Sequence, residues 1–289
     1  MAANEWLAIA SLNLASTSSS SSGQGRKGRV FLSAPVNWKN LPAQTCENIS
    51  WDSKALAVKM QQETRIGALI IDSKPIQNAN RETVSDIICE AARKDGLSMF
   101  DWNESVHRLQ QRVAQVAEWH PELEIPDLST EHLLTTARAW LPFYLEEGGK
   151  MKTSVTELKK LNLCEILWNI LPYDLQQEID RLAPTHIRVP SGSNIRIDYR
   201  LGAEAPVLSV RLQECFGMTS TPTVDAGRQP LLLELLSPGF KPVQLTQDLA
   251  SFWQGTYFEV RKELKRRYPK HFWPENPLES QAVRGVKRW

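Results

Sequence analysis

The spacing of the apolar residues constrains the fold of this chain most, because it changes twice along the sequence. Up to about residue 75, apolar residues such as Leu56 and Val58 alternate with polar ones, which is the period of a half-buried β-strand. From there to residue 183 the apolar spacing becomes i, i+3, i+4, i+7, which indicates amphipathic helices. After Pro184 short alternating runs return, and a last helical segment follows. The sequence therefore predicts an α+β fold in successive parts.

Three domains are expected: an OB-like β-barrel over residues 1–75, a helical bundle over 76–183, and a mixed α/β module with a basic tail over 184–289. In the first domain, the Ser- and Gly-rich segment 16–28 is expected to be a loop between two strands, and we assign it no function. The run 54–71 is expected to be a long strand that bends at Gly67 to close the barrel. The barrel is inferred from the number of strands alone.

Composition excludes several classes of protein. The net charge of the 289 residues is only +1, so the whole chain is not a polycation for nucleic acids. From Tyr257 onward, however, nine Lys and Arg face four Asp and Glu, a local balance of +5. The four cysteines are far apart, which argues against a zinc site and suits the reducing cytoplasm, and no segment predicts a membrane span. We expect a soluble, cytoplasmic protein.

The segment R-V-P-S-G-S-N-I-R-I-D-Y, residues 188–199, contains a Ser-Gly-Ser turn between two alternating runs. It lacks the lysine and the following helix of an ATP-binding loop. One interpretation is a structural β-turn in which Gly192 takes a positive φ. The other is a nucleic-acid site in which the turn and its flanking arginines hold a phosphate and Tyr199 stacks on a base. The candidate residues are Arg188, Ser191, Ser193 and Arg196.

The tail segment R-K-E-L-K-R-R-Y-P-K-H-F-W-P ends a helix predicted from Thr246 or Gln247 to about Arg267. Its cations could neutralise phosphates, and its aromatic residues Tyr268, Phe272 and Trp273 could stack on bases. Alternatively, the cations complement the helix end and the aromatic rings pack on the core. The candidate binding residues here are Lys262, Arg266, Arg267 and Lys270.

No catalytic or metal motif stands out in the sequence. His107 and His132 have no carboxylate or cysteine at ligand spacing, His186 and His271 are isolated in the sequence, and no G-x-S-x-G or H-E-x-x-H occurs. Tryptophans of the helical part, such as Trp168, are interpreted as core residues. We therefore expect no catalytic residue, no metal site and no cofactor in this chain.

Three long segments are more specific than any short motif: A-P-T-H-I-R-V-P-S-G-S-N-I-R-I-D-Y, P-V-L-S-V-R-L-Q-E-C-F-G, and L-L-L-E-L-L-S-P-G-F-K-P-V-Q-L-T through Y-P-K-H-F-W-P. In this order they resemble the C-terminal region of HrpB-type DExH-box ATP-dependent helicases. Upstream, N-E-W-L-A-I-A-S-L-N-L, R-V-F-L-S-A-P and R-I-G-A-L-I-I resemble the OB-fold segment of that family. The run 59–65 departs from the family's Arg-rich strand, which weakens the expectation that the barrel holds RNA.

The resemblance implies an accessory, nucleic-acid-binding part of an RNA or DNA helicase. The expected partners are single-stranded nucleic acid, RNA in particular, and the motor domains of the same full-length protein. The family's ATP and Mg²⁺ belong to two RecA-like motor domains, whose Walker A lysine and D-E-x-H motif do not occur in this sequence. An alternative is a scaffold that docks onto the motor or a partner without touching nucleic acid.

Overall fold

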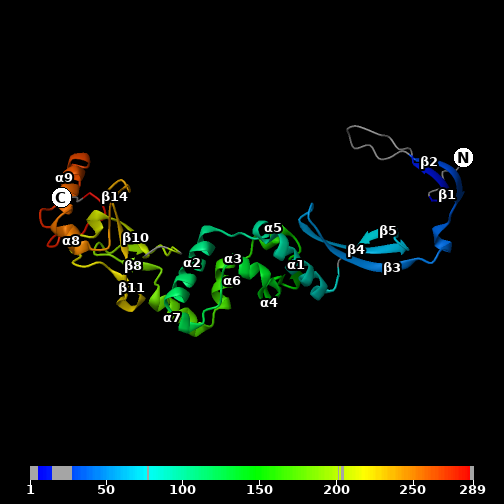
Figure 1. Cartoon of the computed structure of the whole chain (residues 1–289), viewed down its shortest axis with the longest axis horizontal. Helices are drawn as coiled ribbons and strands as arrows, with labels where there is room; N and C mark the ends of the chain where they lie inside the picture. The colour runs from blue at the N-terminus through cyan, green and yellow to red at the C-terminus, as the bar shows by residue number, and fades with distance from the viewer. Residues whose placement is uncertain (1–5, 15–27, 77, 201, 203–204, 287–289) are drawn as a thin grey trace. The chain divides into compact units, whose positions relative to one another are not determined.

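The computed structural model describes residues 6–14, 28–76, 78–200, 202 and 205–286. The chain divides into two compact units, residues 1–88 and 89–289, and the division falls within helix α1 (Arg81–Met99). Figure 1 shows the order of the elements from β1 near the N-terminus to α9 near the C-terminus. The fold is a mixture of helices and several small sheets, so the predicted combination of α and β structure is confirmed at this level. None of the described helices is long and apolar enough to cross a membrane.

The first unit contains two antiparallel sheets. Strands β1 (Leu7–Leu14) and β2 (Gly28–Pro35) form a two-stranded ribbon, and β3 (Gln44–Asp52), β4 (Ala57–Ile66) and β5 (Leu69–Pro75) form a three-stranded sheet. The described strands of the two sheets are not hydrogen-bonded to each other, so they do not form a closed barrel, and the OB-like barrel is not confirmed. The predicted Ser-rich loop lies largely outside the described residues.

The expected long strand that bends at Gly67 is wrong. The run is a β-hairpin in which Ile66 pairs with Leu69, and Gly67 and Ala68 form the loop. Gly67 has a φ of +56°, as two-residue hairpin turns favour, because their twist matches that of the flanking strands. An alternating run does not distinguish a bend from a reversal, and this explains the error.

The second unit begins with a helical part whose largest element is α2 (Glu104–Trp119). Asn103 caps this helix, because its side chain accepts hydrogen bonds from the backbone N–H groups of Ser105 and Val106. The buried face of α2 is mostly apolar but also contains Arg112 and Gln115, and the helix contacts α6 and α7. The elements after α2 are α3 (Thr130–Thr135), α4 (Ala137–Trp140), the short strands β6 (Glu146–Glu147) and β7 (Lys150–Met151), α5 (Val155–Leu158), α6 (Leu163–Ile170) and α7 (Tyr173–Leu182).

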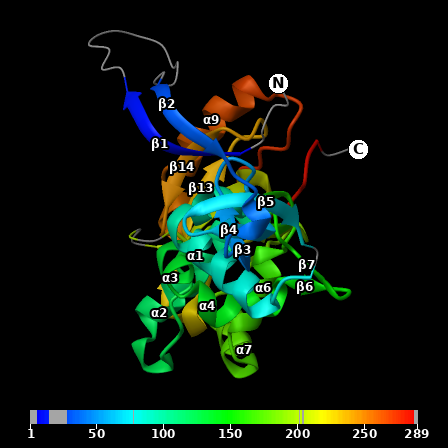
Figure 2. The same ribbon diagram turned by 90° about the vertical axis from the view of Figure 1, so that its right-hand side faces the viewer.

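The C-terminal part of this unit is built around a sheet in which β13 (Leu232–Leu236) lies between β10 (Val207–Arg211), its parallel neighbour, and β14 (Pro242–Thr246), its antiparallel one. Helices α8 (Leu249–Gln254) and α9 (Tyr257–Arg267) follow, and α9 lies beside this sheet in both views (Figures 1 and 2). Two small hairpins complete the part: β8 (His186–Arg188) with β9 (Asn194–Arg196), and β11 (Thr223–Val224) with β12 (Gln229–Pro230).

The single helix predicted near the C-terminus is two helices, α8 and α9. Asp248 caps the first by accepting a hydrogen bond from the Ser251 backbone N–H, as expected of a residue at that position. The helical path breaks at Gly255, whose φ of −125° and ψ of −85° are not helical. Glycine costs little to place in such a conformation, so this residue permits the break.

Contacts within the second unit join its helical part to its C-terminal part. Nε2 of His120, at the end of α2, lies 2.6 Å from Oδ1 of Asp225. The rings of Trp119 and Tyr199 meet edge to face with centroids 6.3 Å apart. Residues on both sides of the domain boundary predicted at residue 183 belong to the same compact unit. The boundary therefore stays a prediction.

Candidate nucleic-acid interface

The turn predicted as a phosphate site lies between β8 and β9. Gly192 has a φ of +81°, and its N–H donates to the Val189 carbonyl at 2.8 Å, so the predicted β-turn with a left-handed glycine is confirmed. The Ser191 hydroxyl donates to Glu214 Oε2 at 2.7 Å. A serine has a single hydroxyl proton to donate, so this donor already has an acceptor inside the protein.

The acceptor Glu214 is only 3% exposed, and it also pairs with Arg211 at 2.8 Å. Burial alone would raise the pKa of this carboxyl, but hydrogen bonds from Ser193 and Ser191 and the Arg211 guanidinium hold the pKa below its usual range. The two serines therefore stabilise an internal carboxylate. A phosphate bound to the hydroxyls of Ser191 and Ser193 would have to replace their hydrogen bonds to Glu214, and it would then lie beside the negative charge of that carboxylate.

Two arginines lie beside the turn. The side chain of Arg188 ends near Gly192, and Arg284 donates from Nε to the Ser191 carbonyl at 3.2 Å. Among the described residues, Arg188 has no carboxylate partner. Sequence reasoning missed Arg284, which lies 93 residues from Ser191 and carries no local signal. Cationic character at this turn thus comes from the arginines.

The alternation after the turn is confirmed, but the role expected for Tyr199 is wrong. Arg196 is exposed while Ile197 and Tyr199 are buried. Tyr199 is only 4% exposed and donates its hydroxyl to the Pro184 carbonyl at 2.8 Å, so it is not an open ring on a strand face. Asp198 pairs with Arg200 at 2.7 Å, which leaves Arg196 without an ion pair to any described residue.

The clearest cationic surface among the described residues is one face of α9. A shallow groove is lined by Phe258, Arg261, Lys262, Lys265 and Arg266, whose spacing places them on neighbouring helical turns. Phe258 is 49% exposed, and Lys262, Lys265 and Arg266 form no ion pair with a described residue. We call Phe258, Lys262, Lys265 and Arg266 the α9 face. It combines unpaired positive charge with an accessible ring.

Two of the three aromatic residues predicted to stack on bases pack on the core instead, and the third, Tyr268, is half-buried. Trp273 is buried and donates from Nε1 to the Tyr268 carbonyl at 2.9 Å. Phe272 lies edge to face against Phe216, with centroids 6.2 Å apart. The alternative interpretation of the tail is therefore right for Phe272 and Trp273, and the accessible ring within α9 is that of Phe258.

The remaining tail residues are not part of the α9 face. The Arg267 guanidinium lies over the Tyr268 ring, 6.0 Å from its centroid, on another side of the helix. Lys270 is exposed in the segment after α9 and does not line the groove. Of the four tail candidates, the structure brings together Lys262 and Arg266.

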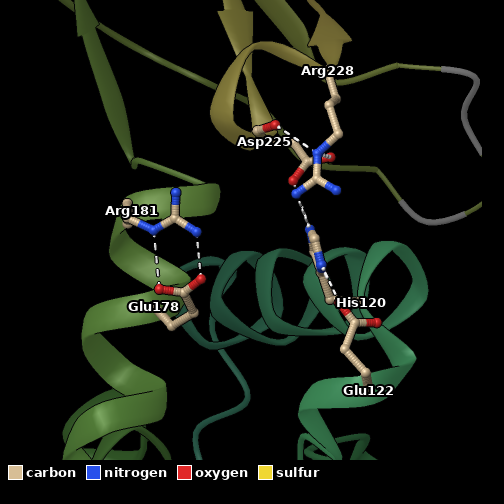
Figure 3. Close-up of polar contacts among 6 residues, drawn as sticks. All are labelled: His120, Glu122, Glu178, Arg181, Asp225 and Arg228. Carbon is tan, nitrogen blue, oxygen red and sulfur yellow. Dashed lines mark hydrogen bonds and ion pairs between the residues drawn. The ribbon is translucent and has the colours of Figure 1, made fainter.

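A buried charged cluster, which sequence reasoning missed, lies at the end of α2 (Figure 3). His120 is 5% exposed, with Nε2 at 2.6 Å from Asp225 Oδ1 and Nδ1 at 2.7 Å from Glu122 Oε1. Two carboxylates need two N–H donors, and only the protonated imidazole offers both. Hydrogen bonds to Asp225 and Glu122 accordingly raise the pKa of His120.

The loop that carries Asp225 is strained. Asp225 and Ala226 have φ values of +54° and +51°, and Gly227 follows with +93°. Left-handed φ costs a non-glycine residue roughly 1–2 kcal/mol. Arg228 closes the loop, with Nε 3.4 Å from Asp225 Oδ2 (Figure 3). The cluster connects residues 105 positions apart and holds no nucleophile, so we assign it to structure rather than to catalysis.

The described residues contain no group of three or more His, Cys, Asp or Glu side chains that could hold a metal ion. In the first unit, Arg65 pairs with Glu63 at 2.5 Å, so a cation in the run that departs from the family pattern is neutralised locally.

Comparison with known proteins agrees with the resemblance seen in the sequence. Residues 140–277 match the family described as ATP-dependent helicase C-terminal, HrpB type. The chain is 35% identical over 246 residues, 85% of its length, to the ATP-dependent RNA helicase HrpB of Escherichia coli (strain K12). It spans 30% of that relative, so it corresponds to less than a third of the longer protein.

Two crystal structures of HrpB from E. coli are also similar. The DExH-box NTPase HrpB has a TM-score of 0.68 at 33% identity, and the match covers 97% of this chain and 34% of that one. The DEAH/RHA helicase HrpB has a TM-score of 0.60 at 33% identity, with 84% and 30% covered. Sequence and fold together identify the chain as a member of the HrpB-type ATP-dependent helicases that corresponds to their C-terminal region.

Proposed function

We propose that this region binds single-stranded nucleic acid, RNA in particular, as an accessory part of an HrpB-type ATP-dependent helicase. The observation that carries the proposal is the α9 face, where three cations without described carboxylate partners surround an exposed phenylalanine. Cations neutralise phosphates and release their counterions, and an exposed ring stacks on a base of any sequence. Arg188 and Arg196 are proposed to extend this contact, while Ser191 and Ser193 hold the turn.

The motor chemistry is proposed to lie elsewhere in the full-length protein. ATP and Mg²⁺ would be held by motor domains of the kind that the family resemblance implies, and this chain would contribute affinity for the strand. The family resemblance also supports an OB-like role for residues 1–75, in which the two described sheets belong to one nucleic-acid-binding domain. The four free cysteines agree with a cytoplasmic location.

Contact with the motor domains is a second part of the proposal. The β1–β2 ribbon exposes Leu7, Ile9, Phe31 and Leu32, each by half or more of its surface. An apolar patch of this kind marks a surface that another protein segment covers. We propose that the motor domains of the same helicase contact this ribbon. This role complements strand binding, because it uses the first unit and leaves the α9 face free.

The binding proposal predicts a salt dependence that can be measured. We expect the association constant for a fluorescein-labelled RNA strand to fall steeply between 25 and 200 mM KCl. In the triple variant Lys262→Ala, Lys265→Ala, Arg266→Ala, the log–log slope should become shallower by about two units, because each lost phosphate contact removes ~0.7 for a single strand. Fluorescence anisotropy titrations give both slopes.

The matched control removes three exposed cations from the helical part: Lys94→Ala, Lys159→Ala, Lys160→Ala. It should keep the wild-type slope, since these residues lie outside the α9 face. Equal slopes for the wild type and the α9 variant would reject the α9 face as the phosphate-binding surface. A DNA strand of the same sequence, titrated in parallel, tests the expected preference for RNA.

A further inference from the structure

A second site is suggested by a pocket in the second unit, between α2, α6 and the β8–β9 hairpin. Its volume is about 320 Å³, at the lower end of the range for small-ligand sites. Its main lining residues are Arg108, Arg112, Cys164, Trp168, Arg196 and Tyr199. The lining surface is mostly apolar, and the cations belong to arginines from both α2 and β9. The pocket is separate from the α9 face, with which it shares no residue.

The floor of the pocket is held rigidly. Arg112 is buried, bonded to the Ala183 carbonyl and to Asp180, and its guanidinium lies 5.3 Å from the centroid of the Trp168 ring. Trp168 itself is half-buried rather than part of the closed core. A tryptophan whose ring is fixed in this way loses little side-chain entropy when a flat ligand stacks against it.

Two arginines lie at the rim of the pocket, one paired with a carboxylate and one not. Arg108 pairs with Glu104 within α2, so its charge is locally compensated. Arg196 is exposed and has no ion pair with a described residue, which leaves its guanidinium available for an anion. An apolar, aromatic interior with a free arginine at its edge matches a nucleotide, whose base is flat and apolar and whose phosphate is an anion.

We propose that this pocket receives one unpaired base of a single-stranded nucleic acid, with an adjacent phosphate on Arg196. The volume admits one nucleotide and excludes a paired duplex. The proposal rests on the proposed strand-binding function and adds a base-binding subsite to the phosphate contacts of the α9 face. The shared chemistry is a nucleotide unit, which could come from a strand or from a free mononucleotide.

The first test compares two strands of equal length and charge, a 12-nucleotide RNA and an abasic strand with the same phosphates. We expect the wild-type protein to bind the RNA at least about fivefold more tightly, since stacking of one base contributes that much. Trp168→Leu should lower this ratio severalfold, and the preference that remains is due to stacking on Phe258. The α9 triple variant should bind both strands more weakly and keep the ratio, because its lost contacts are to phosphates.

A second variant keeps the proposal testable if Trp168→Leu does not fold. Arg196→Gln changes an exposed side chain, and it should make the salt slope shallower by about 0.7 while leaving the far-ultraviolet circular dichroism unchanged. An unaltered slope in this variant would count against the placement of a phosphate on Arg196.

Cys164 provides a readout that does not depend on any variant, because its thiol lines the pocket. Its alkylation by iodoacetamide, followed by mass spectrometry, should be slowed by the RNA strand, while the exposed Cys46 in the first unit should react at an unchanged rate. The abasic strand should protect Cys164 less. Protection by uridine monophosphate without protection by the strand would overturn the proposal, because the pocket would then take a free nucleotide.

The outcomes separate the two proposals. If Trp168→Leu leaves the ratio between the RNA and the abasic strand unchanged and the salt slope stays steep, the base pocket is rejected and the strand-binding function stands. If neither strand binds at low salt, the strand-binding function fails and the pocket proposal fails with it. A preference for the RNA over the abasic strand that Trp168→Leu lowers, together with protection of Cys164, supports the pocket.

Discussion

Replacing Phe216 by alanine is expected to lower the free energy of unfolding of the second unit by about 4 kcal/mol. The Phe216 side chain is fully buried, and its ring lies 6.1 Å from Trp253 and 6.3 Å from Tyr257, between centroids. Its loss would leave a cavity that these large neighbours cannot fill, so both the transfer energy and the packing contacts are lost. Equilibrium unfolding in urea, followed by circular dichroism, measures the change.

Phe143→Ala is the matched control, because the Phe143 side chain is 80% exposed. Its effect should stay within about 0.5 kcal/mol, as for other surface substitutions. A loss below about 1 kcal/mol in Phe216→Ala would show that the aromatic cluster is not the core that supports α8 and α9.

Replacing His120 by alanine is expected to cost about 3 kcal/mol, because it leaves the buried Asp225 without a hydrogen-bonded partner of opposite charge on α2. The charged groups around His120 are Asp225, Glu122 and Arg228, with the Glu178–Arg181 pair nearby, and only Asp225 and Glu122 accept its protons. Urea unfolding at pH 6 gives the size of the effect.

The same substitution should change how stability depends on pH. The folded-state pKa of His120 is raised above its unfolded value of about 6.5, so its contribution is complete below that pH. As the pH rises through the raised pKa, the folded protein loses the proton and the contribution disappears. The wild type should therefore become less stable from pH 6 to 9, and His120→Ala should lack that part of the slope.

His107→Ala is the matched control, because it removes an exposed histidine from α2. It should keep the wild-type dependence on pH. If wild type and His120→Ala lose stability in parallel as the pH rises, the buried cluster does not hold an imidazolium.

Local signals in the sequence predicted local structure well. The alternation around Ile197, the left-handed Gly192 and the capping role of Asp248 are properties of a few neighbouring residues, and the structure contains all three. Strand pairing is different, because it depends on which strands meet. Five strands in the first unit were compatible with a barrel, and the described ones form two separate sheets.

The candidate site was predictable only in part, for the same reason. The spacing of Lys262 and Arg266 along one helix is visible in the sequence. Whether Phe272 faces solvent or the core depends on Phe216, far away along the chain. The His120–Asp225 contact and the pocket around Trp168 likewise join segments that are distant in the sequence, and no local sequence pattern predicts them.

The contacts that join α2 to the C-terminal part also define a length. Trp119 on Tyr199 and His120 on Asp225 hold the pocket and the α9 face in one compact unit. A strand that occupied both would have to bridge a separation set by the folded protein. The second unit would then bind oligonucleotides according to their length, because only a strand with enough nucleotides between the two points of attachment can reach both.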